Sequence, residues 1–167
     1  MPFSTQPRPG TDGGRHGQHV LAERIAMAAS LCGARGVHLT KLRRHILELL
    51  WESSRPTGAY ELVKALERRE SRPVGPPTVY RALEFLISQG LAAKIESRNA
   101  YVPCTHPERN QDCLFFICDC CGETTELEDQ RLDRLITENA TQMGFRAVRR
   151  VIEVEGMCTT CAVSGAA

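Results

Sequence analysis

Two pairs of cysteines place the strongest constraint on the fold of this chain. Cys118 and Cys121 form the first pair, Gly122 follows directly, and Cys158 and Cys161 form the second pair. Each Cys-x-x-Cys turn directs two thiolates at one point, and four thiolates around zinc make a closed tetrahedral site. The glycine suits the tight turn that aims backbone N–H groups at the sulfurs. The paired spacing favours a structural zinc ion over a disulfide pair or a redox couple. Such a site holds a domain together and leaves the function open.

The composition agrees with a metal-binding role for the cysteines. The chain has 167 residues, enough for one medium domain or two small ones, and eight cysteines. It has no apolar run long enough to cross a membrane and no apolar signal core at its N-terminus. We therefore expect a cytoplasmic protein, in a reducing compartment where cysteines bind metals rather than form disulfides.

The charge is unevenly divided along the chain. Residues 1–103 carry 15 Lys and Arg against 9 Asp and Glu, whereas residues 104–167 carry 6 against 11. The first part is therefore basic and the second acidic, although the net charge is only +1. This asymmetry indicates that only the first part faces a polyanion such as DNA. Chance asymmetry between two solvated surfaces is the alternative.

Residues 1–17 are rich in Pro and Gly and are expected to be a disordered tail. Apolar residues at helical spacing then predict four helices, which begin near Gln18, Thr40, Pro56 and Pro76. Their apolar faces are expected to be Leu21, Ile25, Ala28 and Ala29; Leu42, Ile46, Leu49 and Leu50; Ala59, Leu62, Val63 and Leu66; and Val79, Ala82, Leu83 and Leu86.

The fourth helix turns Tyr80 and Arg81 outward when its apolar face points inward. Two strands are expected after it, at Leu91–Glu96 and Ala100–Pro103. Short helices followed by a β-hairpin are typical of a winged helix-turn-helix domain, here residues 18–103. In such a domain, the second helix of the helix-turn-helix enters the major groove of DNA. An arginine there can reach a guanine edge. A winged helix that binds protein instead of DNA is the alternative.

The pattern of apolar residues in 104–167 predicts a small α/β domain. Strands are expected at Leu114–Ile117, Glu123–Glu128 and Phe145–Glu155. Between the last two, a helix ends at Gly144 and carries Leu132, Leu135, Ile136, Ala140 and Met143 on its apolar face. About 60 residues build too small a core, and a structural zinc ion can add on the order of 10 kcal/mol. We expect this domain to pair with a second copy, because DNA-reading winged helices commonly act as two-fold dimers.

Four residues with metal-binding side chains lie near the predicted hinge between the two parts. They are Cys104, His106, Cys113 and Glu126. Zinc accepts all three donor types, whereas thiolates disfavour magnesium, calcium and manganese. A second, regulatory zinc ion at the hinge is one interpretation. Buried packing cysteines and a surface carboxylate are the other.

Two cysteines and two arginines leave alternatives open. Cys120 could compete with Cys121, but the spacing and the following glycine favour Cys121. Cys32 is expected to be a small packed residue. Arg43 and Arg44 lie in the first turn of a predicted helix, where the helix dipole disfavours cations. Either a phosphate is their partner or they are solvated.

Three motifs resemble those of the ferric uptake regulator superfamily, and within it the zinc uptake regulator branch. They are Pro76-Pro77-Thr78-Val79-Tyr80-Arg81-Ala82-Leu83, Phe116-Ile117-Cys118-Asp119-x-Cys121-Gly122 and Gly156-x-Cys158-x-x-Cys161. The resemblance covers about residues 20 to 161. It implies a homodimeric bacterial repressor that, when zinc is in excess, binds palindromic double-stranded DNA operators of zinc-uptake genes. It implies no enzymatic activity, no small-molecule substrate and no membrane.

The resemblance also assigns roles by position. It implies structural zinc ligands at Cys118, Cys121, Cys158 and Cys161; sensing ligands at Cys104 and Glu126; and DNA contacts at Tyr80, Arg81, Thr78, Tyr60 and Arg43. About two zinc ions per monomer follow, one structural and one regulatory.

The chain departs from this family in two places. A histidine usual near Ala93 is missing, and so is the histidine-rich stretch before the first cysteine pair, where Cys113 stands at a ligand position. The predicted regulatory ligands are therefore Cys104, Cys113 and Glu126, completed by His106, Glu96 or water. Two alternatives are an iron- or peroxide-responsive regulator of the same superfamily and a thiol redox enzyme. The first would favour histidine and carboxylate ligands, and the second needs exposed thiols of lowered pKa.

Overall fold

The computed structural model describes residues 15–107, 112–127, 129–148 and 150–165, which form two compact units. The first unit holds the described residues up to 107, and the second holds those from 112 onward. Residues 1–14 of the predicted tail lie outside the described residues. Among the helices of the described part, none is both long and apolar enough to cross a membrane.

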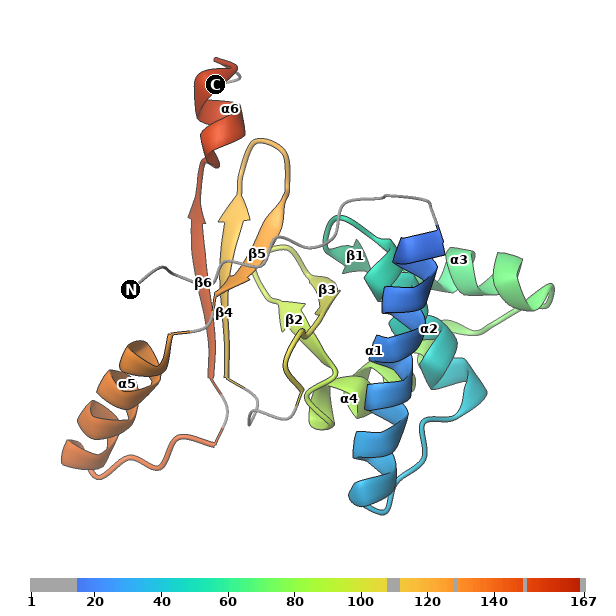
Figure 1. Ribbon diagram of the computed structural model, residues 1–167, viewed down its shortest axis with the longest axis horizontal. Coiled ribbons are helices and arrows are strands. Elements are labelled where there is room, and N and C mark those ends of the chain that lie inside the picture. The colour runs from blue at the N-terminus through green and yellow to red at the C-terminus, as the bar shows by residue number, and fades with distance from the viewer. Residues whose placement is uncertain (1–14, 108–111, 128, 149, 166–167) are drawn as a thin grey trace. The chain divides into compact units, whose positions relative to one another are not determined.

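The first unit contains four helices and a small sheet (Figure 1). Its elements in chain order are α1 (Arg15–Ala34), α2 (Lys41–Glu52), β1 (Thr57–Gly58), α3 (Ala59–Glu70), α4 (Pro76–Ser88), β2 (Ala92–Ile95) and β3 (Ala100–Pro103). Helix α1 starts three residues before the predicted position, so residues 15–17 are helical and not part of a disordered tail. Thr40 is the N-cap residue of α2 as expected, although its side chain makes no capping hydrogen bond.

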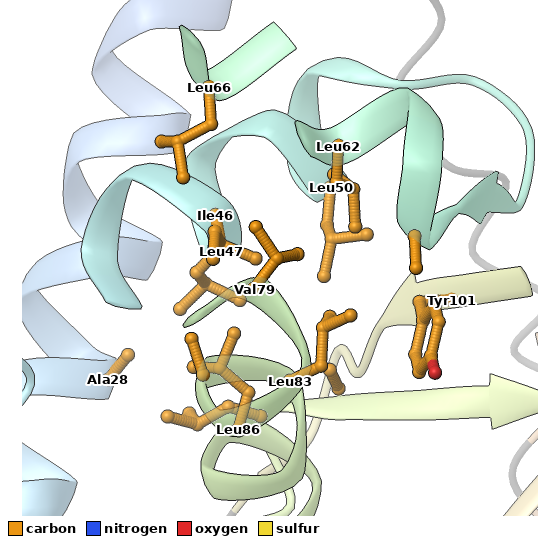
Figure 2. Close-up of a cluster of buried hydrophobic side chains, with 14 of the residues drawn as sticks. Ala28, Ile46, Leu47, Leu50, Leu62, Leu66, Val79, Leu83, Leu86 and Tyr101 are labelled. Carbon is orange, nitrogen blue, oxygen red and sulfur yellow. The ribbon is translucent and has the colours of Figure 1, made fainter. Parts of the chain in front are cut away.

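The core of the first unit lies between α2, α3 and α4, where apolar residues repeat at helical spacing (Figure 2). The predicted inward positions of α3 and α4 are all buried. Helix α1 adds Ile25, Ala28 and Cys32, so Cys32 is a packed residue as expected. Ala29 was predicted to face inward but is exposed, because α1 turns a narrower stripe to the core. Leu47 of α2 is buried and was not predicted.

The sheet of the first unit has the strand order β1-β3-β2, with all pairs antiparallel. The hairpin of β2 and β3 is the predicted wing, and its turn includes Asn99 at φ +46, a left-handed conformation that asparagine tolerates. Strand β1 occupies residues that were predicted to open the third helix. Gly58 is instead the N-cap of α3, where its N–H donates to the Glu61 carboxylate over 3.1 Å.

The second unit contains a three-stranded sheet and two helices. They are β4 (Asp112–Cys118), β5 (Thr124–Leu127), α5 (Gln130–Gln142), β6 (Arg150–Gly156) and α6 (Thr159–Val163). The strand order is β5-β4-β6, with β5 antiparallel and β6 parallel to β4. Residues 145–148 were predicted as the start of the last strand but have no regular structure. Glu128, the predicted end of the second strand, lies outside the described residues, and α6 was not predicted.

Helix α5 is the predicted amphipathic helix, and it ends before Gly144, whose φ is +68. Asp129 caps its start by accepting a hydrogen bond from the Arg131 N–H over 2.8 Å. Yet none of its residues is buried, and Leu135 on its apolar face is 55% exposed. A polar contact ties α5 to β6, because Arg150 donates to the Asp133 carbonyl over 3.0 Å. The apolar face of α5 is thus open to solvent in the single chain.

Candidate metal centre and nucleic-acid surface

Strands β4 and β6 bring the two cysteine pairs together. They run parallel, and their register pairs Cys118 with Gly156, so both strands end at the same edge of the sheet. Beyond that edge, the chain after β4 forms the turn with Cys121, while the chain after β6 enters α6 with Cys158 as its N-cap. Cys161 then lies in the first turn of α6, so one edge collects all four thiols.

The four thiols have the geometry of a tetrahedral metal site. The Sγ atoms of Cys118, Cys121, Cys158 and Cys161 all lie within 4.8 Å of one another, and none of these residues is in a disulfide. Four sulfurs at the zinc–thiolate bond length are about 3.8 Å apart in a tetrahedron. The Sγ atoms of Cys121 and Cys158 are 3.9 Å apart. The donor set and its dimensions therefore fit zinc.

The backbone holds this arrangement in place. The Gly122 N–H donates to the Cys118 carbonyl over 2.9 Å, and Gly122 has φ +74, as the tight turn predicted after the first pair requires. Across the edge, the Asp119 N–H donates to the Gly156 carbonyl over 2.8 Å, and the Cys158 N–H points at the Cys118 sulfur over 3.3 Å. The two turns are therefore fastened to each other through the backbone.

The thiols of the cluster differ in how readily they ionise. The N–H groups of Cys121 and Cys158 donate to the Cys118 sulfur and lower the pKa of Cys118 to about 6. At Cys161, hydrogen bonds with Cys158 and Cys120 and burial raise the pKa of the thiol instead. Crowded thiols cannot all become anions unless a cation compensates them. A divalent metal would supply that charge and displace the remaining protons.

The predicted regulatory ligands are divided between the two units. In the first unit, Cys104 directly follows β3 and is buried, and His106 is half-buried. In the second unit, Glu126 of β5 is half-buried and pairs with Phe115, two residues after Cys113 in β4. The side chain of Cys113 lies outside the described part of the structure. A site formed by these four residues stays a prediction.

The predicted DNA-binding residues of α4 are exposed. Val79, Ala82, Leu83 and Leu86 are buried, so Thr78, Tyr80 and Arg81 face solvent. Tyr60 at the start of α3 is 68% exposed. This confirms the predicted division of α4 into a core face and an outward face. Contact of these side chains with DNA stays a prediction.

The two arginines of the first turn of α2 have partners within the chain. The Arg43 guanidinium lies 3.4 Å from the centroid of the Phe85 ring, and its Nη1 donates to the His38 carbonyl over 2.7 Å. Arg44 pairs with Glu48, one turn further along α2, over 3.1 Å. Contact of either arginine with a phosphate stays a prediction. The packing of Arg43 on Phe85 joins residues 42 positions apart, and no local sequence pattern signals it.

Four helices, of which α4 has an exposed outward face, and a β-hairpin define a winged-helix protein, to which this chain adds a second unit with four clustered thiols. The family model of the Ferric uptake regulator family matches residues 34–155. The zinc uptake regulation protein of Escherichia coli (strain K12) is 38% identical over 141 residues, which are 83% of this chain and 81% of that protein. The chain belongs to the ferric uptake regulator family.

Two solved structures resemble the fold over most of its length. A zinc uptake regulator complexed with zinc and DNA superposes with a TM-score of 0.80 at 36% identity, covering 88% of this chain and 98% of that one. Holo XcZur superposes with a TM-score of 0.76 at 37% identity, covering 84% of this chain and 98% of the other. The similarity therefore includes both units.

Proposed function

We propose that this chain is a zinc-responsive transcriptional repressor that binds palindromic operators of zinc-uptake genes as a zinc-loaded homodimer. One observation carries the proposal. A chain with four thiols at zinc-site dimensions and an exposed recognition helix superposes over 88% of its length on a zinc uptake regulator complexed with zinc and DNA. The protein would act in the cytoplasm and would have no catalytic activity.

The structural zinc ion is assigned to Cys118, Cys121, Cys158 and Cys161. Zinc in such a site supplies cross-linking and no open coordination position. The ion would join the turn after β4 to the start of α6, which the backbone contacts already hold near each other. This role is structural, so it requires a separate site for sensing.

The regulatory zinc ion is assigned to Cys104, Cys113 and Glu126, with His106, Glu96 or water completing the ligand set. Their thiolate, carboxylate and imidazole donors suit zinc, and the assignment rests on this chemistry and on the family resemblance. Together with the structural site it gives about two zinc ions per monomer. Zinc would favour the DNA-competent state by binding it more tightly than the other state.

DNA recognition is assigned to α4, with Tyr80, Arg81 and Thr78 facing solvent. Arginine can donate two hydrogen bonds to a guanine in the major groove. Tyr60 and Arg43 would lie against the phosphate backbone. Arg43 already packs on Phe85, so we expect it to reach a phosphate with the part of its guanidinium that does not donate to His38.

The homodimer is supported by the apolar face of α5. A helix of this amphipathic pattern normally buries its apolar stripe, yet Leu135 and Met143 are exposed, the latter by 82%. A two-fold axis would bury the same face of both copies. Two winged helices so related would read a palindrome.

A zinc titration monitored by fluorescence anisotropy of a labelled operator duplex tests the proposal. The protein should retain one tightly held zinc ion, and a second, chelatable zinc ion should switch on DNA binding. Cys104→Ser should abolish the switch, whereas Cys32→Ser, the same change at a buried packing cysteine, should preserve it. Full DNA binding with only the tightly held zinc would contradict the proposal. Activation by Fe²⁺ and not by zinc would favour the iron-responsive alternative.

A further inference from the structure

The short segment from Cys104 to Pro107 is fastened to the end of the recognition helix. Helix α4 ends at Ser88, and the next residues turn through Gly90 at φ +67. The Leu91 N–H then donates back to the Leu86 carbonyl of α4 over 2.8 Å, and the Cys104 N–H donates to the Leu91 carbonyl over 3.1 Å. Cys104 is therefore two backbone hydrogen bonds away from α4.

Arg35 makes a second attachment between the same two pieces of chain. It directly follows α1, and its guanidinium donates from Nη1 to the Gln89 carbonyl over 2.6 Å and from Nη2 to the Pro107 carbonyl over 3.3 Å. Gln89 is the C-cap residue of α4. A cation is favoured there, because the helix dipole leaves partial negative charge on the last carbonyls. One side chain thus bridges the end of α4 and the far end of the 104–107 segment.

Gly90 shows how closely the two pieces approach. A Cβ atom at Gly90 would lie 3.5 Å from the Pro107 carbonyl oxygen, the same atom that accepts from Arg35. The segment is thus attached at residue 104 by the backbone and at residue 107 by Arg35. Cys104 and His106 lie between or at these attachments. A change in the conformation of this segment would be passed directly to the C-terminal turn of α4.

We propose that Arg35 is a positioning residue that couples metal binding at Cys104 and His106 to the recognition helix α4. This inference rests on the proposed function, since it names the contact through which zinc would influence DNA binding. Arginine suits the role because its planar fork donates to two carbonyls at once, whereas lysine offers a point charge. A residue that only stabilised the fold would affect DNA binding equally with and without zinc.

The test is the ratio of DNA affinities measured with and without the second zinc ion. Coupling between two sites typically changes affinity by roughly 5- to 150-fold. Arg35→Met, which keeps an unbranched apolar stem and removes the guanidinium donors, should lose most of this ratio, and Arg35→Lys should fall between Arg35→Met and the wild type. Arg68→Met removes the same charge from an exposed position of α3 and should keep the full ratio.

A second measurement needs neither DNA nor zinc. Amide hydrogen exchange of the zinc-free, full-length protein should show faster exchange of the Cys104 N–H in Arg35→Met than in the wild type. The Leu83 N–H in the middle of α4 should keep its rate. This pattern would show that the attachment is loosened while the helix stays folded.

The outcomes of the affinity measurement distinguish failure of the Arg35 inference from failure of the proposed repressor function. An unchanged zinc-dependent ratio in Arg35→Met overturns the inference and leaves the repressor intact. Equal weakening with and without zinc also overturns it, since it assigns Arg35 to the fold or to a phosphate contact. A wild type whose DNA binding ignores zinc overturns the proposed function itself, and the inference with it.

Discussion

The two units of this chain are stabilised in different ways. The first unit buries a contiguous cluster contributed by four helices, and side chains such as Leu62, Leu66 and Leu86 are fully inaccessible. In the second unit, the buried residues among those described are few, and two of them are cysteines of the thiol cluster: Phe115, Ile117, Cys118, Thr124 and Cys161. No residue of helix α5 is fully buried, and only Ile136 and Ala140 are half-buried.

This difference shows what each unit needs in order to fold. Fully burying a leucine contributes about 1.5–3 kcal/mol, and the first unit has many such side chains. The second unit lacks them and instead gathers four thiols at the dimensions of a zinc site. We expect the first unit to depend on its apolar core and the second on a metal and a second copy. Four substitutions test this contrast.

The largest effect is expected from loss of the metal site. Cys158→Ser removes one of four thiolates and should cost the second unit a large part of the roughly 10 kcal/mol that a structural zinc ion can supply. Zinc per chain, measured by atomic emission, should fall by one, and proteases should cut within residues 112–163. Cys120→Ser, which leaves the four clustered thiols in place, is the matched control. Equal resistance to proteolysis in Cys158→Ser and Cys120→Ser would contradict the expectation that the second unit depends on its metal.

A smaller effect is expected from the core of the first unit. Leu83→Ala removes a buried side chain of α4 and should destabilise this unit by about 2–5 kcal/mol. Trp51 is the single tryptophan and lies in α2, so its fluorescence during urea unfolding reports on the first unit. Zinc content should stay constant. Release of zinc together with the change in Trp51 fluorescence would show that the two units unfold as one.

The exposed face of α5 is expected to matter only between copies. Leu135→Glu places a charge on the apolar face and should weaken the homodimer by about 2 kcal/mol, or roughly 30-fold in Kd. Sedimentation at several protein concentrations measures this shift. Glu138→Gln changes a charge on an exposed position of the same helix and should leave the association unchanged. An unaltered dimer in Leu135→Glu would assign the interface to another surface.

The smallest effect concerns an ion pair between α2 and α3. Burial opposes ionisation of Glu70, but His45, 2.5 Å away, together with Lys41 and Arg72, outweighs it and lowers the pKa of Glu70 below its ordinary 4.5. The contribution of Glu70 to stability is therefore present above pH 4.5 and is lost as the pH falls through the lowered pKa. Trp51-monitored unfolding of Glu70→Gln should show a weaker pH dependence below pH 4.5 than the wild type. An identical pH dependence of stability in Glu70→Gln and the wild type would show that Glu70 does not contribute to stability through this ion pair.

The sequence predicted the parts of the fold that repeat or that require a rare residue. The stripe of Val79, Ala82, Leu83 and Leu86 is regular over two turns, so it defined both faces of α4. The thiol cluster followed from paired spacing, because each Cys-x-x-Cys turn is a local structure. The parallel register of β4 with β6 then brings the two cysteine pairs together, and no sequence pattern indicates that register.

The parts that were missed depend on contacts between distant segments. Ala29 fits the helical pattern of α1, but only the packing of α1 on the core decides which side of the stripe is buried. Strand β1 has two residues and exists through its pairing with β3. Arg35 reaches two carbonyls 54 and 72 positions away, which no local pattern could indicate.

Hydrogen exchange of the whole chain, with its zinc and after chelation, tests the contrast between the units most directly. We predict that removal of zinc abolishes protection in β4, β5 and β6 and leaves α2, α3 and α4 as protected as before. Retained protection of β4 and β6 without metal would contradict the account, because the second unit would then fold on its apolar residues alone. Simultaneous loss of protection in α2–α4 would contradict it as well, since the first unit would then depend on the same metal.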